Sequence, residues 1–125
     1  MKTPRERKRR SVRTEVRVAR QHGGQRTPRS GAGHIKGDCR VKGKYRIECK
    51  ETDKLSYRIH IEEWLRFVHE AMKAGEVPVL HITLTDKRGR KHELAMLRHA
   101  DHLGILQSLK VAEDACEAHE RDLLD

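Results

Sequence analysis

Two short segments in which apolar and polar residues alternate constrain the fold of this chain more than any other feature. In residues 45–50 (YRIECK) and 38–41 (DCRV) every second side chain is apolar, as in a strand with one buried face. Residues 42–44 (KGK) join the two segments, and Gly43 can supply the positive φ of a tight turn. The pattern therefore predicts an antiparallel hairpin with all its apolar side chains on one face.

The register of this hairpin brings two acidic residues together. If residues 42–44 form the loop, Cys39 lies opposite Ile47, and Asp38 lies opposite Glu48 with about 5 Å between the two Cβ atoms. A shift by one residue would mix apolar and polar side chains on each face. Two carboxylates in direct opposition destabilise a hairpin unless a cation joins them. We therefore predict a cation site at Asp38 and Glu48; the alternative is that both are ordinary surface charges.

Periodicity and turn residues place the other elements along the chain. Gly23 and Gly24 end a helix that begins near Ser11, and Gly75 ends a second, strongly amphipathic helix. This order predicts an α/β protein in which helices flank a mixed β-sheet, formed as one domain over residues 11–125. The expected elements beside the hairpin are a helix from Ser11, a loop at 27–33, a helix over 59–74, strands over 77–85 and 91–97, and an acidic helix over 103–124.

The excess positive charge of the chain lies in its first 30 residues. They hold 11 Lys or Arg against two acids, while the remaining 95 residues hold 17 of each kind. Such a segment is typical of proteins that bind nucleic-acid phosphates, and the alternative is a solubilising or nuclear-import-like tail. Nothing apolar anchors residues 1–10, so we expect them to be a flexible basic arm.

The apolar residues and the cysteines narrow the class of protein further. No apolar run approaches the ~20 residues that span a bilayer, and the first 20 residues lack the apolar stretch of a secretory signal. We therefore expect a cytoplasmic protein with no membrane partner. Three cysteines without a CxxC pair argue against a disulfide framework or a structural zinc site, and Cys39 and Cys49 are expected in the core.

Two carboxylates with a lysine beside them suit the hydrolysis of phosphodiesters. Mg²⁺ prefers oxygen ligands and needs only one or two carboxylates, because it keeps several waters. Asp38 and Glu48 supply these, the Cys49 carbonyl is a third oxygen, and Mn²⁺ is expected to substitute for Mg²⁺. Lys50 points the same way as Glu48, since residues i and i+2 of a strand share a face, and it can hold the attacking water or stabilise the phosphate. The alternative for Lys50 is a plain salt bridge with Glu48.

These residues resemble a known family signature. Gly37-Asp38, followed by Glu48-Cys49-Lys50, is similar to the D…(E/D)xK pattern of the PD-(D/E)xK nuclease superfamily, with Gly37 where a proline is usual. Within that superfamily, residues 24–50 resemble the small Holliday junction resolvases of archaea and phages. The resemblance covers residues 11–97 and extends neither to residues 1–10 nor to the acidic helix at the end of the chain.

The resemblance implies a restriction-endonuclease-like core and Mg²⁺-dependent cleavage of DNA that leaves a 5′-phosphate, in a bacterial, archaeal or phage-infected cell. It implies that Glu15 joins the active site and that Ser30 lies near the scissile phosphate; the alternatives are an arginine partner on the same helix for Glu15 and a plain loop role for Ser30. A homodimer is expected, because two sites related by a dyad cut a four-way junction symmetrically. DNA contacts are expected from Arg9, Arg10, Arg13, Arg26, Arg29, Ser30 and Lys36.

Three other functions remain open for such a sequence. A nicking or repair endonuclease acting on other forms of DNA would use the same residues. A catalytically inactive nucleic-acid-binding protein of the same fold would bind DNA without cleaving it. An RNA-directed accessory protein is the third, although the sequence has no motif of aromatic residues for base stacking.

Overall fold

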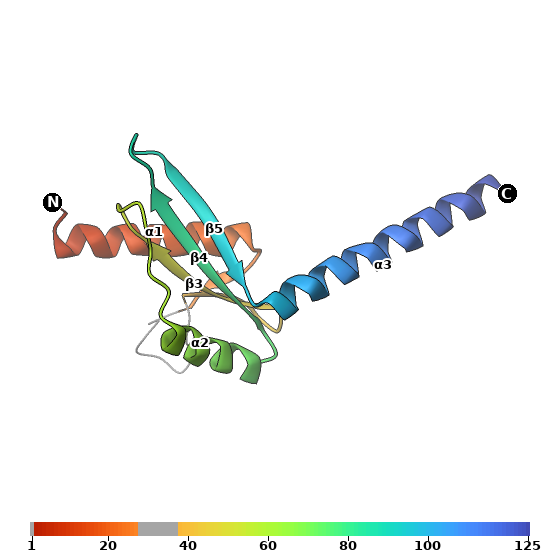
Figure 1. Cartoon of the computed structure of the whole chain (residues 1–125), viewed down its shortest axis with the longest axis horizontal. Coiled ribbons are helices and arrows are strands. Elements are labelled where there is room, and N and C mark those ends of the chain that lie inside the picture. The colour runs from red at the N-terminus through yellow and green to blue at the C-terminus, as the bar shows by residue number, and fades with distance from the viewer. Residues whose placement is uncertain (1, 28–37) are drawn as a thin grey trace.

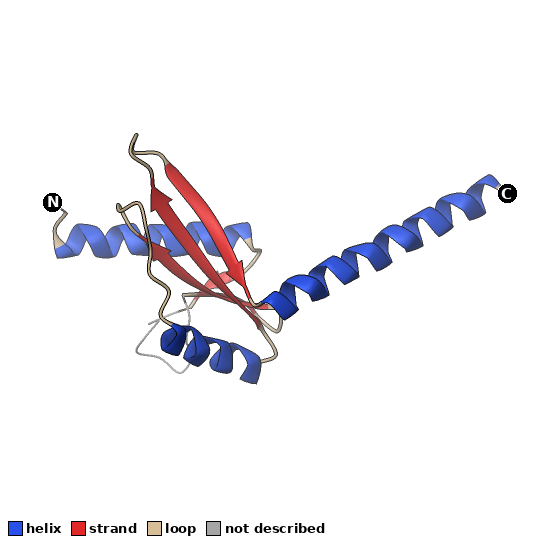
Figure 2. Ribbon diagram, in the orientation of Figure 1, coloured by secondary structure: helices blue, strands red, loops and turns tan. Residues whose placement is uncertain are grey.

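A five-stranded mixed β-sheet forms the centre of the molecule, with its strands in the order β1-β2-β3-β4-β5 (Figures 1 and 2). The computed structural model describes residues 2–27 and 38–125. Neighbouring strands pair antiparallel except β3 and β4, which are parallel and are connected through α2. The α/β class with a mixed sheet and flanking helices is therefore confirmed. The elements are α1 (Pro4–Gln21), β1 (Gln25–Arg26), β2 (Cys39–Val41), β3 (Tyr45–Glu51), α2 (Ile61–Lys73), β4 (Val77–Thr85), β5 (Lys91–Leu97) and α3 (His99–Leu124).

The predicted hairpin register is confirmed along β2 and β3. Cys39 pairs with Ile47, and Val41 pairs with Tyr45 at the turn, where Gly43 has a φ of 74°. The buried face of this hairpin packs against α1, as the alternating pattern requires.

Helices cover opposite faces of the sheet. The core on the α1 side consists of five buried side chains from α1, β2, β3 and β4: Val18, Ala19, Cys39, Ile47 and Val79. Cys49 packs against this cluster, with its sulfur 4.0 Å from that of Cys39, so both cysteines lie where a core role predicts. On the other face, α2 packs against β4 and buries Phe67, Val68 and Ala71.

The first helix begins earlier than the sequence predicts. It starts at Pro4 rather than near Ser11, so residues 4–10, predicted to be a flexible arm, are helical. Thr3 and Glu6 form a capping box, in which the Thr3 hydroxyl accepts from Glu6 N–H and the Glu6 carboxylate accepts from Thr3 N–H. Proline is well suited to the first position of a helix. The capping box and Pro4 therefore start the helix at residue 4, although residues 4–10 include no apolar side chain that could anchor it.

Three other boundaries also differ from the expected ones. Gln25 and Arg26, which follow the glycine pair that ends α1, form β1 by pairing with Arg40 and Cys39. Such a two-residue strand has no alternating pattern to reveal it. The helix α2 is shorter than expected, and α3 starts at His99 instead of Leu103 and runs without a break to Leu124.

A buried ion cluster joins the β2–β3 hairpin to the start of β4. The Glu76 carboxylate, whose side chain is 0% exposed, accepts from Arg46 Nε at 2.8 Å, from Arg40 Nη2 at 2.5 Å and from Gly43 N at 3.0 Å. Burial acts to raise the pKa of Glu76, but the hydrogen bonds from Arg40 and Gly43 and the charge of Arg46 outweigh it and lower the pKa. Glu76 is therefore held as a carboxylate in the folded protein.

Candidate active site

Asp38 lies at the end of the hairpin, where the regular pairing of β2 stops. Its backbone N–H donates to Ile47 O at 2.9 Å, and its carbonyl accepts from Thr27 N at 2.8 Å. The Asp38 carboxylate accepts from Cys49 N at 2.7 Å. This side chain thus takes the place of the next backbone acceptor that β2 would have offered to β3. Asp38 is held by three hydrogen bonds, rather than by the direct pairing with Glu48 that the regular register predicts.

The Cys49 carbonyl points toward the same edge of β3 as Asp38. The N–H and C=O of one strand residue point to the same neighbouring strand, and Cys49 N–H meets the Asp38 carboxylate. The even-numbered residues of β3 instead pair with β4, as the bond from Val77 N to Lys44 O illustrates. The Cys49 carbonyl therefore lies on the same side of β3 as Asp38, where a third metal ligand is expected.

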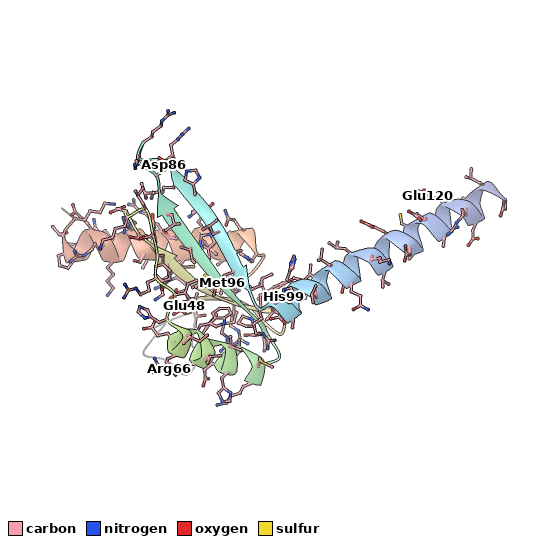
Figure 3. The ribbon with its side chains drawn as sticks, viewed as in Figure 1. Glu48, Arg66, Asp86, Met96, His99 and Glu120 are labelled. Carbon is pink, nitrogen blue, oxygen red and sulfur yellow. The ribbon has the colours of Figure 1, made fainter. Side chains whose placement is uncertain are left out.

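Glu48 lies on the face of β3 that is turned away from α1 and toward α2 (Figure 3), and Lys50, two residues further along the strand, shares that face. Lys50 Nζ is 3.8 Å from Glu48 Oε1, and the two side chains are 38% and 33% exposed. Burial raises the pKa of Glu48; the Lys50 ammonium acts to lower it, and the nearby carboxylates of Asp38 and Glu63 raise it further. The ion pair is therefore long, and both side chains are partly exposed.

Glu15 approaches Asp38 from the α1 side. It is 8% exposed, its carboxylate accepts from Arg26 Nε at 2.5 Å, and its backbone carbonyl accepts from the Cys39 thiol. Burial raises the pKa of Glu15, Arg26 acts to lower it, and the Asp38 carboxylate raises it. The partner of Glu15 is therefore Arg26 on β1 rather than an arginine of its own helix, and the Arg26 guanidinium is engaged within the protein.

The Asp38 carboxylate acts on acidic residues on both faces of the sheet. Its charge raises the pKa of Glu15 on one side and of Glu48 on the other, so the Asp38 carboxylate repels both of these carboxylates. Over residues 2–27 and 38–125, no three His, Cys, Asp or Glu side chains are grouped closely enough to hold a metal. A Mg²⁺ site with two carboxylates, one carbonyl and several waters does not need three, and the donor set at Asp38, Glu48 and Cys49 fits that requirement.

Addition of Mg²⁺ is expected to raise the melting temperature of the protein, because a bound cation relieves this repulsion. At about ten times the dissociation constant the gain is ~1.4 kcal/mol, or about 5 °C for a domain of this size. Differential scanning calorimetry with MgCl₂, against NaCl of equal ionic strength, measures the effect. Asp38→Asn should remove it, and Glu70→Gln, on the exposed surface of α2, should not. An equal shift in Asp38→Asn would rule out a cation at this position.

The residues predicted to contact DNA fall into three groups, of which the first is Arg26, paired with Glu15. Arg9, Arg10 and Arg13 line a groove of about 690 Å³ between α1 and the ends of β4 and β5. Arg10 is paired there with Asp53 at 2.9 Å, whereas Arg9 and Arg13 have no acidic partner in the part of the chain that the structure describes. Arg29, Ser30 and Lys36 lie outside the described residues.

The structure adds residues that sequence reasoning missed. Lys2, Arg17 and Lys91 also line the groove; Lys91 comes from β5, and only the folded sheet brings it opposite α1. Tyr57 lies near Glu48 and Lys50: burial raises the pKa of its hydroxyl, the Lys50 charge acts to lower it, and the Glu48 charge raises it. The sequence did not predict this position, because Tyr57 lies in the loop before α2 and no regular spacing relates it to Asp38 or Glu48.

Comparison with known proteins gives no relative for this chain. No family model, no curated protein and no solved structure matches it. Within the described residues, no helix combines the length and the apolar character needed to cross a membrane.

Proposed function

We propose that this protein is a Mg²⁺-dependent endonuclease that cleaves branched DNA, in the manner of a Holliday junction resolvase with a restriction-endonuclease-like core, and that it acts as a homodimer. One observation carries the proposal. The Asp38 carboxylate is fixed by Cys49 N–H near enough to Glu48 for its charge to raise the pKa of that carboxyl, and the Lys50 ammonium lies 3.8 Å from Glu48 Oε1; we infer that these groups and the Cys49 carbonyl share one ligand.

Each group has a distinct part in the proposed reaction. Asp38, Glu48 and the Cys49 carbonyl would hold Mg²⁺, which when bound supplies positive charge to the phosphate and lowers the pKa of the attacking water. Lys50, which is only loosely paired, stabilises the negative charge that develops on the phosphate oxygens. Hydrolysis breaks the bond between phosphorus and O3′ and leaves a 5′-phosphate and a 3′-hydroxyl.

The basic groove supports DNA as the substrate. Lys50 pairs with Ile82 in the β3–β4 ladder, one residue before Thr83 at the floor of the groove. The groove and Lys50 thus lie at the same end of the sheet but on opposite faces, so a DNA backbone that passes around this end can contact both. The lining holds more bases than acids: Lys2, Arg9, Arg10, Arg13, Arg17 and Lys91 against Glu6 and Glu93.

The double replacement Arg9→Ala with Arg13→Ala is expected to weaken DNA binding and its dependence on salt. Each lost phosphate contact lowers the slope of log K against log salt by about 0.9 for duplex DNA, so two contacts lower it by about 1.8. Fluorescence anisotropy with a labelled four-way junction over a salt series measures the slope. Arg66→Ala on α2, the residue labelled in Figure 3, is the matched control and should leave the slope unchanged. An unchanged slope in the double variant would exclude phosphate contacts by these two arginines.

The direct test of the activity uses end-labelled synthetic DNA. A four-way junction, a linear duplex and a flap of equal length are incubated with the protein in Mg²⁺, in Mn²⁺ and in EDTA. Symmetric cuts in the junction that require the metal are expected. Preferred cleavage of the flap or duplex would favour a nicking or repair endonuclease, and binding without cleavage in either metal would overturn the enzymatic function.

A further inference from the structure

The last helix, α3, has no partner within the described chain. It is 26 residues long and has no buried residue, and Figure 1 shows it projecting alone from the end of β5. Its leucines Leu103, Leu106 and Leu109 are 51%, 48% and 54% exposed. Helices in proteins owe most of their stability to packing of an apolar face. At the start of the helix, the N-cap residue Arg98 donates to the Asp101 carboxylate at 2.8 Å and to Met72 Sδ of α2 at 3.1 Å.

One side of α3 combines apolar residues with an acidic border. Five of its residues recur at helical spacing along one stripe: Ile105, Leu109, Ala112, Cys116 and Leu123. Glu113 and Glu120 border this stripe on one side, and the helix as a whole holds six acids and two bases, a net charge of −4. A surface that covers this stripe should therefore be apolar along its middle and basic beside it.

The face of α1 that points away from the sheet has this character. Val12 and Val16 are half-exposed and lie in two shallow depressions whose borders include Arg5, Lys8 and Arg20. We call these five residues the outer face of α1. The helix holds eight bases and two acids, a net charge of +6. These five residues do not line the basic groove, but Arg9, Arg13 and Arg17 line both the groove and at least one of the two depressions, so the two surfaces adjoin.

We propose that α3 of one copy of this chain packs along the outer face of α1 of a second copy. Opposite charges and two apolar stripes then meet, whereas α3 against α3 would join two helices of net negative charge. A second copy is required because one residue, Arg98, separates β5 from α3, and α3 leads away from the α1 of its own chain (Figure 1). A dyad would make the contact twice.

This inference deepens the homodimer of the proposed function by naming its surface, and its test uses neither DNA nor metal. One variant carries Glu113→Lys and Glu120→Lys, and a second carries Arg5→Glu, Lys8→Glu and Arg20→Glu. Sedimentation velocity at low salt should show a dimer for the unaltered chain and at least a tenfold weaker association, about 1.4 kcal/mol, for each variant alone. An equimolar mixture of the two variants should restore the dimer as a heterodimer. A monomeric unaltered chain, or a mixture that stays monomeric, would overturn the proposal.

A cross-linking experiment keeps the test independent of charge reversal. Val16→Cys should form an intermolecular disulfide with the exposed Cys116 on mild oxidation, and peptide mass spectrometry identifies the joined residues. Lys73→Cys on α2 should not cross-link. A disulfide between two Cys116 residues in the unaltered chain would instead show that α3 pairs with α3, and would overturn the contact with α1. If the protein dimerises through this contact but does not cleave DNA, the proposed nuclease activity is wrong and the contact between α3 and α1 still holds.

Discussion

The variants Asp38→Asn, Glu48→Gln and Lys50→Ala are each expected to lower Mg²⁺-dependent cleavage of a four-way junction by at least about 10³-fold, because each removes a metal ligand or the charge that stabilises the transition state. Asparagine at position 38 still offers an oxygen to Cys49 N–H, so the hairpin should keep its structure. Single-turnover cleavage of a labelled junction measures the rate, and circular dichroism checks the fold.

Binding of the junction separates a catalytic role from a structural one. All three variants should bind the junction in EDTA about as well as the unaltered chain, since the groove arginines are intact. Glu70→Gln replaces a glutamate on the exposed surface of α2, where it is 3.5 Å from Lys73, and should cleave normally. Full activity in the three variants would remove this site from the reaction.

The largest effect on stability is expected from Glu76→Gln. Removing the carboxylate leaves the guanidinium of Arg46, 5% exposed, buried without a counter-charge, and breaking such a pair costs about 3–5 kcal/mol. Urea unfolding measures the loss. Glu70→Gln is again the control, because an exposed pair contributes about 0–1 kcal/mol. A loss below ~1 kcal/mol in Glu76→Gln would contradict the role of the cluster.

The same residue sets a pH dependence. The pKa of Glu76 is lower in the folded than in the unfolded chain, so its contribution is fully present above the unfolded value, and it is lost as pH falls through the folded one. The difference in unfolding free energy between the unaltered chain and Glu76→Gln should therefore shrink as pH falls below the ordinary value of 4.5. A difference that stays constant through this range would show that Glu76 is not ionised in the folded protein.

Local patterns predicted the parts of the fold that depend on neighbouring residues. The β2–β3 register follows from alternation around Gly43, and the bounds of β4 and β5 coincide with the predicted ones. The common face of Glu48 and Lys50 could be predicted in the same way, because it is a property of one strand. The start of α1 could also have been predicted, from the capping box of Thr3 and Glu6.

Contacts between distant segments could not be predicted from spacing. The pairing of Glu15 with Arg26, and the opposition of Lys91 to α1 across the groove, depend on how the helix lies on the sheet. Asp38 was expected in regular pairing, and only the structure reveals that its side chain completes the edge of β3. The helical stripe of α3 does not itself reveal which surface covers it.

The parallel pairing of β3 with β4 has a consequence for how the chain folds. The β2–β3 and β4–β5 hairpins are local and can form within about 1–10 μs, but β3 and β4 meet only after the intervening segment, including α2, has crossed over the sheet. Pairings between residues far apart along the chain slow folding, so docking of one hairpin on the other is expected to limit the rate. Substitutions that weaken the pairing of β3 with β4 should slow refolding. Substitutions in the turns of the β2–β3 and β4–β5 hairpins should mainly speed unfolding.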